Sequence, residues 1–147
     1  MNEEMKPYDV TIVWTGGKSG EARVEGMPKI RTGKPPDKEH AYHTPEHLLV
    51  AAAGTCLMNS FIEFTKKMHI QFESFEVEAT GLLEKVGRSF EITRLNMVTR
   101  VGIPSADLRD RFERALELGA KYCYVANSLK AKTTYDHHII VKEDQAE

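Results

Sequence analysis

At 147 residues, the chain has the length of one domain or of one protomer of a tight oligomer. Its 41% hydrophobic and 29% charged residues exclude a disordered or fibrous protein, and its net charge of −2 excludes broad electrostatic capture of nucleic acid. The longest apolar run, residues 48–53, is far shorter than the roughly 18 residues of a membrane span. The N-terminal sequence MNEEMKPYDV also lacks the apolar core of a signal peptide, so we expect a soluble, cytoplasmic protein.

The N-terminal third has the alternating pattern of short strands. Polar and apolar residues alternate between residues 7 and 31, and the glycine-rich segment 16–20 predicts a hairpin turn there. Residues 32–44 contain two prolines, a glycine and many polar side chains, which predicts a loop.

A long helix is predicted over residues 45–69. Thr44, Pro45 and Glu46 are the residue types that begin helices: a hydroxyl cap, a proline at the first position and a carboxylate near the positive end of the dipole. The first half of this segment is apolar nearly all round, which predicts a helix buried on all sides.

The rest of the chain predicts a hairpin over residues 72–101, helices within residues 105–130 and a final strand over residues 133–141. This order indicates an α+β fold in which antiparallel sheets wrap around a long central helix. One twisted six-stranded sheet cannot cover such a helix on every side. We therefore expect a homodimer whose central helices lie between two sheets.

The two cysteines, Cys56 and Cys123, are candidates for redox chemistry. A structural disulfide is disfavoured in a cytosolic protein, which leaves two inert buried thiols or a pair that reacts with oxidants. Cys123 stands at the predicted start of a helix, whose amides favour a thiolate. The number of cysteines alone does not distinguish inert thiols from a reactive pair.

The histidines give a second hypothesis. His40, His43 and His47 have a spacing near that of metal sites, and Asp37 and Glu39 are close in sequence. No cysteine joins this group and two of the histidines fall in the predicted loop, so metal binding is kept as an alternative.

Two segments resemble the signature motifs of the OsmC/Ohr family. These are TPEHLLVAAAGTCLMNSF at residues 44–61 and CYVANSLKA at residues 123–131. With the order of predicted elements, the resemblance covers nearly the whole chain and implies a single OsmC-like domain over residues 1–147. Family members are intertwined homodimers that use a cysteine pair to reduce organic hydroperoxides and, in some cases, hydrogen peroxide.

The resemblance implies that Cys56 is the peroxidatic cysteine, Cys123 the resolving cysteine and Glu46 the carboxylate of the site. It implies no cofactor, only an external dithiol reductant such as a dihydrolipoyl protein or thioredoxin. Ten helical residues rise about 15 Å. Glu46 would therefore complete the site around Cys56 of the other subunit, and activity would require the dimer.

The site cation has three candidates. Lys18 stands where the Ohr branch has an arginine after a glycine pair, whereas Arg31 best matches the arginine of the OsmC branch, which favours that branch. Arg23 is the third candidate. Tyr124 stands where the family usually has a proline. A non-catalytic member of the fold that binds a small molecule or acts in a stress response, with vestigial cysteines, remains the alternative.

Overall fold

The structure, a computed structural model, describes residues 5–36 and 41–142. The chain divides into two compact units, Met1–Leu48 and Leu49–Glu147. Each unit contains one three-stranded sheet, so the strands of the described residues form two sheets rather than one.

The N-terminal unit contains the antiparallel sheet β1-β2-β3. Strand β1 covers Thr11–Gly16, β2 covers Ser19–Arg23 and β3 covers Ile30–Gly33. The predicted hairpin is confirmed, with Gly16 and Gly17 both at positive φ in its turn. Strand β3 runs two residues into the segment predicted as a loop.

Helix α1 covers Pro45–Met68, one residue shorter than predicted. The Thr44 hydroxyl accepts a hydrogen bond from the backbone N–H of His47 at 3.1 Å, so the predicted cap is confirmed. His69 has a positive φ of 58°, which ends the helix.

Helix α1 is buried along one stripe only. Ala51, Ala52 and Thr55 are exposed, so the expected burial on all sides is not reached within one chain. By length and composition α1 could span a membrane, since an 18-residue window has a mean hydropathy of 1.4. Core helices have the same composition, and α1 packs against the second sheet. Its buried residues are Ala53, Gly54, Leu57, Phe61 and Thr65.

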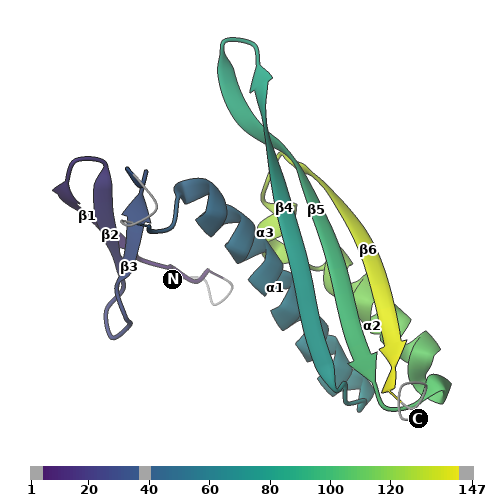
Figure 1. The fold of residues 1–147 in the computed structure, drawn as a ribbon. Helices are drawn as coiled ribbons and strands as arrows, with labels where there is room; N and C mark the ends of the chain where they lie inside the picture. Colours follow the sequence, from purple (N-terminus) through teal and green to yellow (C-terminus); the bar gives the residue numbers. More distant parts are fainter. Residues whose placement is uncertain (1–4, 37–40, 143–147) are drawn as a thin grey trace. The chain divides into compact units, whose positions relative to one another are not determined.

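The C-terminal unit contains the sheet β4-β5-β6. Strands β4 (Ser74–Val86) and β5 (Ser89–Ile103) form the predicted antiparallel hairpin, whose tip extends beyond the third strand (Figure 1). Strand β6 (Lys132–Val141) runs parallel to β5, so the expectation of purely antiparallel sheets is wrong. The physical reason is the helical crossover between β5 and β6, which returns the chain to the start of β5.

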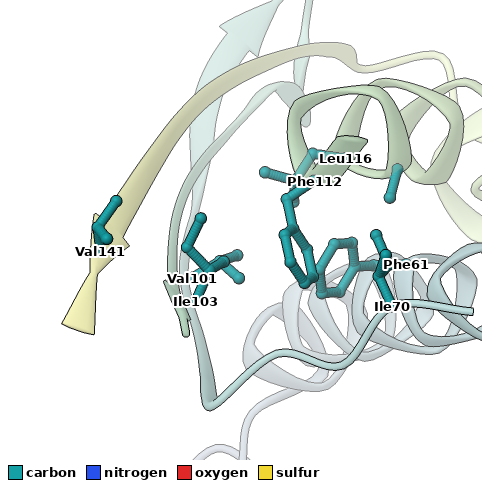
Figure 2. Close-up of a cluster of buried hydrophobic side chains, with 8 residues drawn as sticks. Phe61, Ile70, Val101, Ile103, Phe112, Leu116 and Val141 are labelled. Atoms are coloured by element: carbon teal, nitrogen blue, oxygen red, sulfur yellow. The ribbon is translucent and has the colours of Figure 1, made fainter. Parts of the chain in front are cut away.

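This crossover consists of the short 3₁₀ helix η1 (Ala106–Leu108), α2 (Arg109–Lys121) and α3 (Tyr124–Asn127). Helices α1 and α2 lie on the same face of the sheet (Figure 1). Between them, Phe61 and Phe112 are fully buried and their ring centroids are 6.4 Å apart (Figure 2). This aromatic contact joins the two helices to the core strands.

The sheet also holds two buried polar atoms without hydrogen-bond partners. Thr99 on β5 and His137 on β6 are register neighbours, and neither Thr99 Oγ1 nor His137 Nδ1 has a partner. Burial lowers the pKa of His137, against smaller opposing effects of Asp136 and Glu117. The folded protein therefore favours the neutral imidazole.

This preference predicts a pH-dependent stability. As the pH falls through about 6.5, the unfolded chain binds a proton that the folded chain resists, so the free energy of unfolding should decrease. In His137→Phe, which retains an aromatic ring beside Tyr135, urea unfolding between pH 7.5 and 5 should show a smaller decrease than in the wild type. The neighbouring His138 supplies the control: because burial is the main cause of the shift at His137, His138→Gln should retain most of the pH-dependent decrease. Equal slopes for wild type and His137→Phe would contradict the prediction.

Candidate active site

Cys56 lies in the middle of α1, partly exposed, at the edge of an open groove of about 840 Å³. The groove follows one face of α1, because residues three, four, seven and eight positions after Cys56 repeat on the same side of a helix. The end of α2 and the residues after it form the opposite wall. The lining residues are Cys56, Asn59, Ser60, Glu63, Phe64, Lys67, Leu118, Tyr122 and Tyr124.

Of the residues that line the groove, only Cys56 was predicted as a site residue from the sequence. Helical periodicity from Cys56 could have identified Ser60, Glu63 and Lys67. No sequence signal could have identified Tyr122, which reaches the groove only because α2 folds back onto α1, whereas Tyr124 directly follows Cys123 in the second motif.

Cys123 is fully buried at the N-cap of α3. Its Sγ donates a weak hydrogen bond to the carbonyl oxygen of Ala53 at 3.8 Å, one helical turn before Cys56. Cys56 packs against the same core cluster and is close enough to affect the ionisation of Cys123. The structure therefore brings the two predicted cysteines together as free thiols.

Burial raises the pKa of Cys123 to about 11. Cys56 contributes to this increase through a hydrogen bond and through its charge when ionised, while the backbone N–H groups of Ala126 and Val125 oppose it. The amides at the start of the four-residue helix α3 do favour the thiolate, as expected, but the cost of desolvation outweighs them, so the net shift is opposite to the one expected. Cys123 is a neutral thiol at physiological pH.

Tyr135 on β6 is a further neighbour of the two thiols, and no sequence pattern pointed to it. It packs against the cluster that contains Cys123 and Cys56. Burial raises its pKa to about 12, with smaller contributions from Cys123 and Cys56. Its hydroxyl therefore stays protonated beside the cysteine pair.

The N-terminal unit has a separate pocket of about 470 Å³ that holds two of the three candidate cations. Arg31 lies on β3 with its guanidinium 5.2 Å from the centre of the Tyr42 ring. Lys18 lies in the β1–β2 turn. The lining residues are Gly16, Gly17, Lys18, Ser19, Arg31, Lys34, Pro35, Pro36 and Tyr42.

Arg23, the third candidate cation, forms an ion pair outside this pocket. Its guanidinium contacts Glu21 on the same strand at 2.7 Å, and this hydrogen bond lowers the pKa of Glu21. Glu46 is exposed in the first turn of α1. Within residues 5–36 and 41–142, no ion pair joins Glu46 to Arg31.

The histidine hypothesis receives no support from the residues that the structure describes. His43 pairs with Thr32 through an isolated backbone bridge, and the His47 ring bonds the Thr44 hydroxyl at 2.7 Å. No group of three or more potential metal ligands gathers anywhere in the described part of the chain. The remaining members of the cluster, Asp37, Glu39 and His40, lie outside the described residues.

Comparisons with known proteins agree on one family. The family model for OsmC-like proteins matches residues 37–138. An OsmC-like protein of unknown function from Vibrio cholerae has a TM-score of 0.80 at 20% identity, covering 90% of this chain and 99% of the other. An OsmC-like protein from Mycoplasma pneumoniae has a TM-score of 0.77 at 16% identity, covering 92% and 97%.

A third solved structure, an organic hydroperoxide resistance protein from Elizabethkingia anophelis with thiocyanate bound, has a TM-score of 0.65 at 18% identity. The match covers 92% of this chain and 98% of the other chain. No curated protein matches the sequence. At these identities the structural matches establish the α+β fold with its two sheets and long helices, in which α1 is a core helix.

The contrast between the two thiols predicts different reactivities. In the reduced native protein at pH 7.5, iodoacetamide should alkylate Cys56 at least about tenfold faster than Cys123, because Cys123 is buried and protonated. Peptide mass spectrometry over time measures both rates, and in 8 M urea the rates should become similar. Equally fast alkylation of Cys123 in the native protein would contradict the assigned burial.

Proposed function

Because the chain belongs to the OsmC-like protein family, we propose that it is a cysteine-based peroxidase that reduces organic hydroperoxides. Cys56 is the peroxidatic cysteine and Cys123 the resolving cysteine. Hydrogen peroxide is a second candidate substrate of the same site.

One observation carries this proposal: a partly exposed thiol in an open groove lies next to a buried second thiol. The groove gives a hydroperoxide access to Cys56. Its aromatic walls, Phe64, Tyr122 and Tyr124, provide apolar surface for an alkyl or aryl group. Cys123 is protected from outside oxidants, so it reacts only with what forms on Cys56.

The proposed catalytic cycle has three steps. The Cys56 thiolate attacks the distal oxygen of the hydroperoxide, forming Cys56 sulfenic acid, and the departing alkoxide takes a proton to become an alcohol. The Cys123 sulfur then attacks the Cys56 sulfur, forming a disulfide. The hydroxyl of the sulfenic acid leaves as water with the Cys123 proton. An external dithiol reduces the disulfide and becomes oxidised itself.

Arg31 is the proposed site cation. A guanidinium would stabilise both the Cys56 thiolate and the charge on the leaving alkoxide. Lys18 lines the same pocket as Arg31, whereas Arg23 is held by Glu21. The use of Arg31 matches the OsmC branch of the family.

Glu46 is proposed to complete the site of a second subunit. Both Glu46 and Cys56 belong to the unbroken helix α1, and ten residues of helix rise about 15 Å, so the two cannot meet within one chain. In a homodimer, Glu46 of one chain would hold the cation beside Cys56 of the other.

Exposed apolar side chains support the homodimer. Val10, Ile12 and Trp14 are exposed at alternate positions at the first strand, and Leu83 and Phe90 are exposed at the tip of the β4–β5 hairpin. Surfaces of this kind mark protein–protein contacts, and a second copy of the chain would cover them together with the bare side of α1.

The proposed cycle needs no cofactor and takes its electrons from a dithiol reductant, such as a dihydrolipoyl protein or thioredoxin. The reducing cytoplasm supplies such dithiols and keeps both cysteines free between turnovers. The alternative, a non-catalytic binding protein of the same fold, predicts no change in either thiol upon exposure to a hydroperoxide.

The two cysteine variants separate these functions. Cys56→Ser should lose all turnover, because a serine hydroxyl does not ionise near neutral pH. Cys123→Ser should consume about one equivalent of peroxide, stop as a sulfenic acid and drift to sulfinic acid under excess oxidant. The wild type should form a Cys56–Cys123 disulfide, seen by mass spectrometry after one equivalent of cumene hydroperoxide. Two free thiols in the treated wild type would refute the peroxidase.

A mixing experiment tests the shared site. Alone, Cys56→Ser should be inactive and Glu46→Ala poorly active. A heterodimer of the two has one intact site, which combines Cys56 of one chain with Glu46 of the other. Co-expression with two affinity tags isolates the heterodimer, and its peroxide consumption should exceed that of either homodimer. Purified heterodimers without recovered activity would exclude the cross-subunit role of Glu46.

A further inference from the structure

The resolving step of the proposed cycle has to move a proton within the core. Cys123 is fully buried and protonated, yet its sulfur can attack the Cys56 sulfur only as the proton leaves. No carboxylate, imidazole or amine is among the largest influences on its ionisation, which are burial, Cys56 and two backbone N–H groups. The chain therefore offers Cys123 no ordinary base.

Direct transfer between the two sulfur groups has poor geometry. A proton that passes from the Cys123 sulfur straight to the hydroxyl on the Cys56 sulfur closes a four-membered ring of two sulfurs, one hydrogen and one oxygen. The S–H···O angle in such a ring is far from linear, and hydrogen bonds weaken steeply below about 120°. A second hydroxyl beside the thiols would remove this constraint.

Tyr135 brings a hydroxyl-bearing ring to the thiols from the sheet. It is the register neighbour of Met97 on β5, and side chains at paired positions of adjacent strands point to the same face of a sheet. Met97 is buried in the cluster that contains Cys123, and Tyr135 and Cys56 both pack against that cluster. The ring and the two thiols therefore gather at one place within the C-terminal unit.

The surroundings of Tyr135 hold its ring and leave its hydroxyl available. The ring stacks on that of His137, with centroids 5.8 Å apart and an interplanar angle of 26°. Among residues 5–36 and 41–142, no hydrogen bond engages the Tyr135 hydroxyl. A phenol hydroxyl donates one hydrogen bond and accepts others, so it can take a proton and give one in the same step.

We propose that the Tyr135 hydroxyl relays the proton in the resolving step, an inference that rests on the proposed peroxidase function. As the sulfur–sulfur bond forms and the S–O bond of the sulfenic acid breaks, Tyr135 gives its proton to the departing hydroxyl, which leaves as water. Tyr135 takes the proton of Cys123 in exchange. The ring of reacting atoms then has six members, which allows both transfers to be more nearly linear. Tyr135 ends the step unchanged, and the step consumes no further oxidant or reductant.

The acidities of the two groups suit this exchange. Burial raises the pKa of Tyr135 to about 12 and that of Cys123 to about 11. Because these values are close, a proton passes between the groups with little change in free energy, whereas a carboxylate of ordinary pKa is far too weak a base for Cys123. Both groups are neutral at rest, so the relay places no unpaired charge in the apolar core.

Tyr135→Phe tests the relay, because it removes the hydroxyl and keeps the ring. Reduced protein receives one equivalent of cumene hydroperoxide at pH 7.5, and timed acid quenching with mass spectrometry follows the sulfenic acid and the disulfide separately. The sulfenic acid should form at the wild-type rate, and the disulfide should form at least about tenfold more slowly. Tyr8→Phe, the same change at an exposed tyrosine that lines neither pocket, should match the wild type in both steps.

Two further measurements separate a proton relay from a packing role. Iodoacetamide should alkylate each cysteine of native Tyr135→Phe at the wild-type rate, because the ring stays in place. The variant Tyr135→3-fluorotyrosine retains a hydroxyl on a ring of nearly the same shape, and it should form the disulfide within about threefold of the wild-type rate. A wild-type rate of disulfide formation in Tyr135→Phe overturns the relay. A rate as slow in the 3-fluorotyrosine variant as in Tyr135→Phe, or faster alkylation of Cys123 in Tyr135→Phe, also overturns it.

The same time course separates failure of the relay from failure of the peroxidase. If the wild type forms the sulfenic acid and the disulfide and Tyr135→Phe keeps pace with it, only the relay is wrong. If the wild type forms neither species, the proposed function is wrong and the relay is wrong with it.

Discussion

The close contact between α1 and α2 at Phe61 and Gly119 determines where both sulfur atoms lie. A Cβ at position 119 would lie 3.2 Å from Cα and N of Phe61, so glycine lets the two backbones approach unusually closely. Four residues later the chain reaches Cys123, which therefore lies against Ala53 and beside Cys56. The same contact packs Phe61 against Phe112 in the core. Core packing and the pairing of the thiols thus have one structural origin.

Burial gives the two sulfurs different chemistry. Cys123 is fully buried, and its pKa of about 11 keeps it a neutral thiol that acts as a small core residue until a sulfenic acid forms next to it. Cys56 faces the groove and meets solutes first. Because the nucleophile is accessible and the resolving thiol is buried, outside oxidants have less chance to attack the wrong sulfur. The backbone amides at the start of α3 can hold the Cys123 sulfur as it gives up its proton.

Local sequence patterns predicted most of the helices and strands. The features that these patterns did not predict depend on contacts between residues distant in sequence. Thr44 and Pro45 mark the start of α1, and alternation marks the long hairpin, because both signals act over a few residues. The parallel direction of β6 depends on the whole crossover before it. The spacing of Cys56 and Cys123 could not show that they meet, nor could it reveal that burial overcomes the helix start at Cys123.

The two units contribute different parts of the proposed chemistry. The N-terminal unit holds Arg31 and its cationic pocket but no cysteine, whereas the C-terminal unit holds both cysteines. Helix α1 begins at Pro45 with Glu46 in its first turn and carries Cys56 about 15 Å further along. A straight helix cannot bring its own start back to its middle. If Glu46 serves Cys56, the partner must therefore supply it, and dimer formation becomes a chemical requirement of the site as well as a means of covering apolar surface.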